Sequence, residues 1–184
     1  ILGVDPAYRT GCKLAVVDEH GTYLTHTVIY PTPPQSDYEK SANVIKEFAQ
    51  KYHISAVAIG NGTASRETQE FFARLNKETG LNLAYTVVSE AGASIYSASK
   101  IATEEYPNLD VTIRGAISIA QRLRDPMAAL VKIDPKSLGI GQYQHDVDQA
   151  QLKKSLDQTV ENAVNRVGVN LNTASKHLLT YISG

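Results

Sequence analysis

The first thirty residues contain three short runs of residues that are typical of β-strands. The runs are ILGVD (1–5), CKLAVVD (12–18) and TYLTHTVIY (22–30). Gly21 lies between the second and third runs and is the usual signal for a hairpin turn that joins an antiparallel pair. This pattern predicts a meander of three strands at the start of the chain, and it constrains the fold more than any other feature.

After residue 30, helical and strand patterns alternate. Strands are expected at 54–60 and 83–89, and helices after Ser36 or Asp37, after Asn61-Gly62, through 91–105 and at about 113–124. The order β-β-β-α-β-α-β-α is typical of an α/β fold with an RNase H-like mixed sheet flanked by helices, antiparallel on one side and parallel on the other. A doubly wound Rossmann order fits less well, because it should not begin with three hairpin-linked strands.

The character of the sequence changes after residue 125. Proline and glycine interrupt a stretch with little periodicity, which predicts a connecting segment. An amphipathic helix then starts at Gln149, with Asp148 as its expected N-cap and Gly168 as its stop. Asn172 or Thr173 is expected to cap a second helix. The chain is therefore divided into a domain at 1–126, a connecting segment at 127–148 and a small helical segment at 149–184.

Composition narrows the class of protein. A hydrophobic content of 42% and a charged content of 20% are typical of a soluble globular chain. The net charge of −1 does not indicate a strongly basic nucleic-acid-binding protein, although a local basic patch would suffice. The single cysteine, Cys12, cannot form an internal disulfide, and no apolar run approaches the roughly 20 residues that span a bilayer. We expect a cytoplasmic protein without a membrane partner, cut from a longer polypeptide.

Two carboxylates stand at strand ends, where ligands gather in open sheets of this kind. Asp5 ends the first strand, and Glu90 follows the strand at 83–89. If those strands are neighbours, both carboxylates face one crevice and form a catalytic and metal-binding pair. Such a pair suits Mg²⁺, which prefers oxygen ligands, and two Mg²⁺ ions about 4 Å apart can cleave a phosphodiester.

Cleavage by that route normally needs a third acid from a following helix. The helix VTIRGAISIAQRLRD carries Arg114 in its first two turns and no acid between Asp110 and Asp125. Either of these two is a candidate third acid, through an irregular geometry. The alternatives stay open, since an Asp before proline often forms a turn and a Glu after a strand often interacts with a helix dipole.

Other stretches are candidates for contact with nucleic acid. GNGTASRE (60–67) is a strand-to-helix turn that can offer backbone N–H groups to a phosphate, although a capped helix start explains it as well. Residues 114–136 hold five basic residues against two acids, which forms either a modest basic patch or a solvated helix face. The residues expected to bind nucleic acid are Arg9, Thr10, Asn61, Thr63, Arg114, Arg122, Arg124 and Lys132.

Five long stretches together resemble the central region of the Tex family of bacterial transcription accessory proteins. They are ILGVDPAYRTG, AIGNGTASRET, VSEAGASIYSAS, RGAISIAQRLRDPMAALVKIDPKSLGIGQYQHDV and VGVNLNTASKHLL. The resemblance implies a YqgF-type RNase H-like domain at 1–126 and, in NTASKHLLTYISG, the first helix of a helix-hairpin-helix cut at its hairpin glycine, Gly184. It also implies an N-terminal helix-turn-helix part and a C-terminal S1 RNA-binding domain, neither of which is in this sequence.

The resemblance also bears on the acids. Related nucleases and Holliday-junction resolvases place acids at positions matching Asp5 and Glu90, and one or more on the last helix, where this chain has Thr112, Arg114 and Gly115. This departure implies a vestigial nuclease site. The family implies a module that binds RNA or DNA, with the transcription machinery as a further partner.

Three rival functions stay open. The main one is an active Mg²⁺-dependent nuclease or resolvase that uses Asp5, Glu90 and either Asp110 or Asp125. The second is half of an actin-like sugar kinase, and the third is a protein-interaction scaffold. We expect no certain cofactor, with Mg²⁺ as the candidate.

Overall fold

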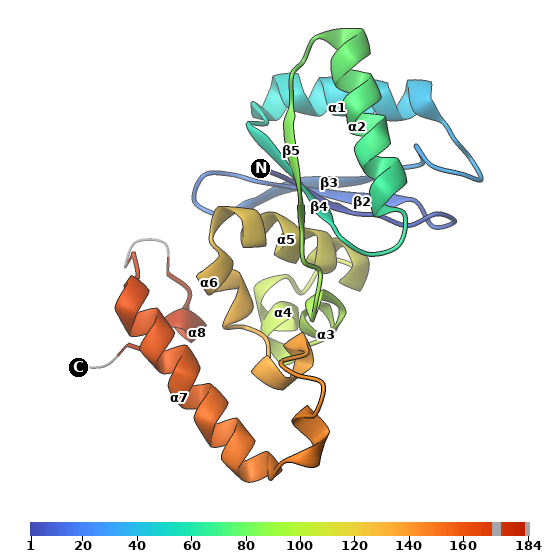
Figure 1. Ribbon diagram of the computed structural model, residues 1–184. Helices are drawn as coiled ribbons and strands as arrows, with labels where there is room; N and C mark the ends of the chain where they lie inside the picture. The colour runs from blue at the N-terminus through green and yellow to red at the C-terminus, as the bar shows by residue number, and fades with distance from the viewer. Residues whose placement is uncertain (171–173, 183–184) are drawn as a thin grey trace.

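A computed structural model describes residues 1–170 and 174–182 (Figure 1). At its centre lies a five-stranded sheet in the order β3-β2-β1-β4-β5. The strands are β1 (Leu2–Asp5), β2 (Cys12–Val17), β3 (Tyr23–Ile29), β4 (Ala56–Gly60) and β5 (Ala84–Val88). The first three strands pair antiparallel, and β4 and β5 continue the sheet parallel to β1. The predicted RNase H-like mixed sheet is confirmed.

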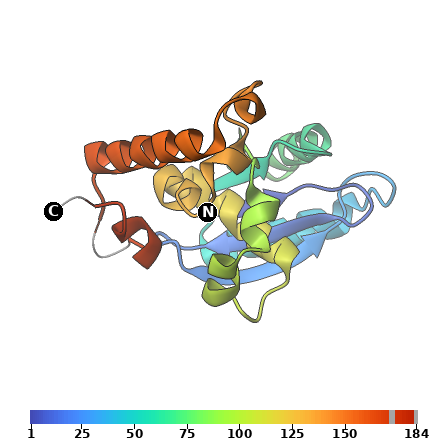
Figure 2. The same cartoon turned by 90° about the horizontal axis from the view of Figure 1, so that it is seen from below.

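Helices cover both faces of this sheet. α1 (Tyr38–Tyr52) and α2 (Ser65–Thr79) lie on one face, and α5 (Val111–Arg124) lies on the other (Figures 1 and 2). The Asp37 side chain caps α1 by accepting a hydrogen bond from the backbone N–H of Lys40, so of the two predicted caps, Ser36 and Asp37, the structure has Asp37.

Side chains alternate along β1 between the two faces. Leu2 and Val4 are fully buried in the core beneath α1 and α2. Gly3 faces α5, and its missing side chain lets that helix pack directly on the strand, because a Cβ at Gly3 would collide with the carbonyl oxygen of Ala116. Asp5 is two residues after Gly3, so its side chain points to the same face of the sheet as Gly3, the face covered by α5.

The single helix predicted at 91–105 is instead two short helices. These are α3 (Ala93–Ser97) and α4 (Lys100–Glu105). Ser99 lies between them in an extended conformation, and its side chain accepts a hydrogen bond from the N–H of Ala102. The prediction was wrong because a serine inside an apolar periodic pattern acts here as a new N-cap.

Short helices also form in the stretch that was predicted as an irregular connection. They are α6 (Pro126–Leu130), η1 (Pro135–Leu138) and η2 (Gln144–Asp146). Leu138, at the end of η1, packs against the buried Tyr96 and Ile133, so this part of the connection contacts the rest of the fold.

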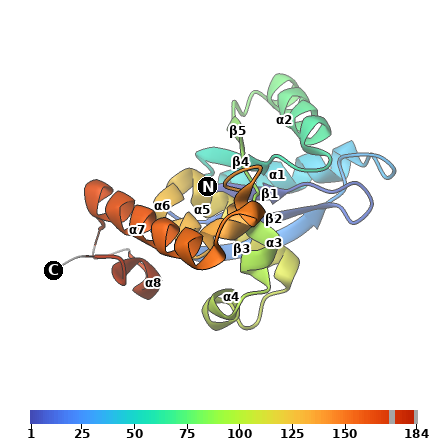
Figure 3. The same cartoon turned by 60° about the horizontal axis from the view of Figure 1, so that its bottom comes forward.

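The last elements lie on the α5 side of the molecule, away from α1 and α2 (Figures 1 and 3). α7 (Gln149–Val167) has the predicted N-cap Asp148 and ends at Gly168. α8 (Lys176–Leu179) is capped by the side chain of Ser175. The predicted caps Asn172 and Thr173, and the predicted hairpin glycine Gly184, lie outside the described residues. In the described part of the chain, the helices are too short or too polar to cross a membrane.

Candidate functional site: a pocket with two carboxylates

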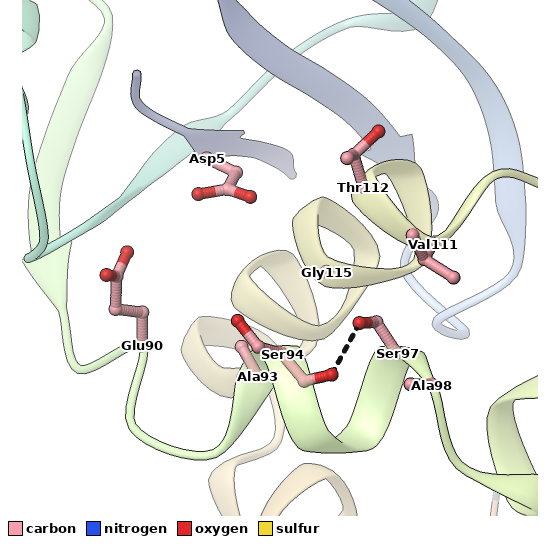
Figure 4. A pocket seen from close by; sticks show the side chains of 9 residues that line it. All are labelled: Asp5, Glu90, Ala93, Ser94, Ser97, Ala98, Val111, Thr112 and Gly115. Atoms are coloured by element: carbon pink, nitrogen blue, oxygen red, sulfur yellow. Dashed lines mark hydrogen bonds between the residues drawn. The ribbon is translucent and has the colours of Figure 1, made fainter. Parts of the chain in front are cut away.

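Asp5 and Glu90 line the same pocket, which has a volume of about 300 Å³ (Figure 4). Asp5 ends β1, and Glu90 lies two residues beyond the end of β5. The remaining lining comes from small or uncharged residues of α3 and α5 and the residue after α3: Ala93, Ser94, Ser97, Ala98, Val111, Thr112 and Gly115.

The route by which the two carboxylates meet differs from the expectation. β1 and β5 are not neighbours, since β4 lies between them. Glu90 reaches past the end of β4 because that strand ends in glycine: a Cβ at Gly60 would lie 2.7 Å from the Oε2 atom of Glu90, and a Cβ at Gly62 would collide with its Oε1 atom. Because Gly60 and Gly62 have no side chains, the carboxylate of Glu90, which follows the edge strand β5, has room to extend toward the central strand β1.

The pocket makes Asp5 a weaker acid. Burial raises the pKa of Asp5 to about 6, and the nearby negative charge of Glu90 adds to this effect. The ammonium group of Lys13 acts in the opposite direction and lowers the pKa of Asp5. Asp5 is therefore ionised at pH 7 but easily protonated in mild acid.

Lys13 is a functional candidate that sequence reasoning missed. It lies directly opposite Asp5 in the β1–β2 ladder and is 9% exposed. Its Nζ donates hydrogen bonds to Thr10 Oγ1 at 2.6 Å, to the Thr10 carbonyl at 3.1 Å and to the Gly11 carbonyl at 3.0 Å. A lysine inside the apolar run CKLAVV was the available signal, because a buried ammonium group needs such partners.

Neither candidate third acid lines the pocket. Asp110 is exposed and caps α5, where its Oδ1 accepts hydrogen bonds from the N–H and the hydroxyl of Thr112 at 2.8 and 2.6 Å. These bonds lower the pKa of Asp110. The Oδ1 of Asp125 accepts from the N–H of Ala128 and caps α6. Across residues 1–170 and 174–182, no three His, Cys, Asp or Glu side chains are grouped so that they could hold a metal ion.

The predicted basic residues of 114–136 do not form a surface patch. Arg114 is buried and donates to the carbonyls of Tyr106 and Ser97 and to the hydroxyl of Thr103. The buried Lys132 pairs with Glu105 at 2.8 Å.

Two further arginines of that set also bond to backbone carbonyls. Arg122 is buried and donates to the carbonyl of Ser89 at 2.7 Å. Arg124, half-buried, donates to the carbonyl of Glu19 at 2.9 Å. These bonds give four of the five basic residues of this stretch, all except Lys136, a partner within the folded structure.

The other predicted contact residues are exposed at the carboxyl ends of β1 and β4. Arg9 and Thr10 are exposed in the loop that follows Asp5. Asn61 and Thr63 are exposed in the turn that follows β4, and the Oδ1 of Asn61 accepts a hydrogen bond from the N–H of Glu90 at 3.0 Å. These four residues therefore flank the end of the sheet at which the pocket lies.

Comparison with known proteins agrees with this description. The family described as "Tex protein YqgF-like domain" matches residues 1–124. The whole chain is 52% identical to "Protein tex" of Bordetella pertussis and 53% identical to "Transcriptional accessory protein Tex" of Neisseria gonorrhoeae, covering 23% and 24% of those proteins. It is also 48% identical to human "S1 RNA-binding domain-containing protein 1", of which it covers 19%.

A solved structure also resembles part of the chain. This is Thermus thermophilus RuvC in complex with a Holliday junction substrate, with a TM-score of 0.42 and 15% identity over 65% of this chain and 89% of the other. The chain spans about a quarter of the length of the first curated relatives that it matches. The family match over most of the chain and the identities above 50% show that this chain belongs to the Tex family.

Proposed function

We propose that this chain is a nucleic-acid-binding module whose RNase H-like pocket binds without cleaving. The observation that carries the proposal is the composition of the pocket, which holds Asp5 and Glu90 but has Thr112 and Gly115 on the side of α5. Phosphodiester cleavage by two metal ions needs more ligands than two carboxylates supply. The pocket is therefore suited to hold a phosphate backbone in place rather than to cut it.

The donor set of the pocket fits one hard divalent cation. Asp5 and Glu90 provide carboxylate oxygens, and Ser94 and Thr112 also line the pocket, with the hydroxyl of Thr112 bonded to Asp110. Mg²⁺ keeps several waters and needs only one or two carboxylates. When bound, it would supply positive charge between the carboxylates and a phosphate, and the remaining polar contacts would come from exposed residues such as Arg9 and Thr63.

The names of the relatives support the choice of partner. One is called a transcriptional accessory protein and another an S1 RNA-binding domain-containing protein. We accordingly propose that the chain binds RNA or DNA, works beside the transcription machinery in the cytoplasm, and continues after residue 149 into a helix-hairpin-helix region. The division at residues 126 and 148 belongs to the same proposal.

A paired assay tests this function. The purified chain is mixed with a labelled RNA hairpin or a four-way DNA junction in Mg²⁺ or Mn²⁺, and both binding and strand length are followed. We expect binding that weakens with salt, and strands that stay intact. Cleavage that disappears in Asp5→Asn would overturn the proposal in favour of the nuclease, and no detectable binding to either substrate would overturn it as well.

A further inference from the structure

The turn that follows β4 contacts Glu90, in addition to the phosphate binding that its sequence predicts. Gly60, Asn61 and Gly62 are called here the 60–62 turn: the two glycines lie against the side chain of Glu90, and Asn61 bonds to its backbone. Both carboxylate oxygens lie where glycine side chains would be, with Oε2 at 2.7 Å from an ideal Cβ at Gly60 and Oε1 in the space of a Cβ at Gly62. The carboxylate rests against bare backbone and points across the pocket toward Asp5 (Figure 4).

The backbone of Glu90 is fixed on both sides. Its N–H donates a hydrogen bond to the Oδ1 of Asn61 at 3.0 Å. The carbonyl of the preceding Ser89 accepts a hydrogen bond from the Nη1 of Arg122 at 2.7 Å. These two bonds hold the corner between β5 and α3 from two directions, one from the end of β4 and one from α5.

Arg122 is buried although its guanidinium bonds to a single backbone carbonyl. The residue is 6% exposed, and among the described residues its Nε and Nη2 atoms have no hydrogen-bond partner. Burial lowers the pKa of Arg122, and the negative charge of Glu90 opposes this. A buried guanidinium with unused donors is costly, so its position behind Glu90 calls for an explanation.

We propose that the 60–62 turn and Arg122 are positioning elements for Glu90, which hold its carboxylate across the pocket from Asp5 so that the pair takes one divalent cation. The inference rests on the proposed function, in which that pair is the cation site. The turn supplies space and one hydrogen bond, and Arg122 supplies the second hydrogen bond and a positive charge. Glu90 can then reach the central strand although β5 lies at the edge of the sheet.

The sharpest test is Gly62→Ala. The new Cβ would occupy the position of Glu90 Oε1, which is the end of a flexible side chain, and the φ of Gly62 lies outside the left-handed range. The fold should therefore persist while the carboxylate moves. We expect a crystal structure of the variant to show Glu90 displaced from Gly62, and titration with Mn²⁺ followed by electron paramagnetic resonance to show affinity weakened about tenfold or more. Gly141→Ala is the matched control, because nothing lies within 4 Å of its Cβ position.

A double-mutant cycle separates positioning from a general structural role. Arg122→Met and Asn61→Ala are each made in the wild-type chain and in Glu90→Gln. We expect each to weaken Mn²⁺ binding about tenfold when Glu90 is present and to leave the residual affinity unchanged in Glu90→Gln. We also expect Arg122→Lys to restore part of the affinity. Equal losses in both backgrounds would overturn the inference.

The inference and the proposed function fail in different ways. A Glu90 carboxylate that stays against the turn in the structure of Gly62→Ala would overturn the positioning role, whatever the chain binds. Cleavage of nucleic acid by the wild-type chain would overturn the proposed function and leave the positioning of Glu90 intact. Absence of Mn²⁺ binding to the wild-type chain, with or without nucleic acid, would overturn the assignment of a cation to the pair.

Discussion

At the scale of single residues, the pocket combines two carboxylates with glycines rather than with further charged side chains. Asp5 is partly buried beside Glu90, and Gly115 leaves open the space that faces it, since a Cβ there would lie 3.6 Å from Asp5 Oδ2. An arrangement of like charges with little solvent is unfavourable without a cation. The two carboxylates therefore destabilise the folded state, and binding of a cation or protonation of Asp5 removes this effect.

Replacing Asp5 should stabilise the chain in a pH-dependent way. The pKa of Asp5 is raised from 3.8 to about 6, which corresponds to about 3 kcal/mol at pH 7 as an upper value. Between these two pKa values the folded state binds more protons than the unfolded state, so wild-type stability falls as pH rises from 4 to 6. We expect Asp5→Asn to raise the free energy of unfolding by about 1–3 kcal/mol at pH 7.5 and to change it little at pH 3.5.

Urea denaturation at both pH values measures this difference. Asp157→Asn, on the exposed side of α7, is the control, because a surface ion pair contributes about 0–1 kcal/mol. A gain for Asp5→Asn that is equal at pH 3.5 and 7.5 would contradict the assignment of the cost to the ionised carboxylate.

A third acid should strengthen metal binding at the pocket. A side chain at residue 115 starts 3.6 Å from Asp5 Oδ2, so Gly115→Asp puts a carboxylate beside Asp5. We expect Mn²⁺ affinity to rise about tenfold or more, because each added charged ligand tightens a site for hard cations. Isothermal titration calorimetry measures the effect, and Gly115→Asn is the control of equal size. Equal affinities for the two variants would show that residue 115 does not reach the ion.

At the scale of elements, buried cations tie the short helices to α5. The guanidinium of Arg114 links α5 to the carbonyl of Ser97 at the end of α3 and to that of Tyr106 after α4. Lys132, which follows α6, pairs with Glu105 at the end of α4. The stretch with the most basic residues therefore uses its charge for internal contacts.

Arg114→Met should destabilise the fold. The substitution removes three hydrogen bonds and leaves the carbonyls of Tyr106 and Ser97 without this donor. We expect a loss of about 2–4 kcal/mol in the free energy of unfolding by urea. Arg66→Met is the matched control, because the side chain of Arg66 is 86% exposed and its loss should cost less than about 1 kcal/mol. Similar small losses for both would mean that Arg114 is not a structural residue.

Replacing Glu105 should destabilise the fold more than replacing its partner Lys132. The Lys132 side chain is 6% exposed and that of Glu105 is 29% exposed. Glu105→Gln leaves a buried ammonium group without its counter-charge, whereas Lys132→Met leaves a carboxylate that still accepts a hydrogen bond from Tyr96. We therefore expect Glu105→Gln to cost about 3 kcal/mol or more and Lys132→Met clearly less. Thermal unfolding of the two variants compares them, and the reverse order would contradict the burial argument.

At the scale of the whole molecule, the net charge is −1, and Lys13, Arg114, Arg122 and Lys132 are buried rather than exposed at the edge of the pocket. Arg9 is exposed after β1, and Arg66 is exposed at the start of α2. Each phosphate neutralised on a single strand contributes about −0.7 to the slope of log affinity against log salt. The chain should therefore bind single-stranded RNA with a shallow slope.

We expect that slope to lie between about −1 and −2, and Arg9→Gln to reduce its magnitude by about 0.7. Fluorescence anisotropy across a salt series measures both values. Lys46→Gln is the control, because Lys46 is exposed on α1, which covers the face of the sheet opposite α5. A change of the same size in Lys46→Gln would show that the bound strand does not follow the pocket edge.

The sequence by itself determined the features that depend on local patterns. The order of the elements along the chain, the hairpin at Gly21, a helix cap at Ser36 or Asp37, the cap Asp148, and the position of Asp5 and Glu90 at strand ends all follow from periodicity and turn chemistry over a few residues. The break of the helix at Ser99 was missed because serine is tolerated inside a helix as well as at its start.

Only the tertiary structure decided which distant residues meet. β4 separates β1 from β5, and the two glycines of the 60–62 turn let Glu90 cross that gap. Whether an arginine is a surface cation or an internal donor also depends on its neighbours, and Arg114 finds its acceptors 8 and 17 residues away along the chain. Such contacts arise from packing between elements, which the local pattern of a sequence does not specify.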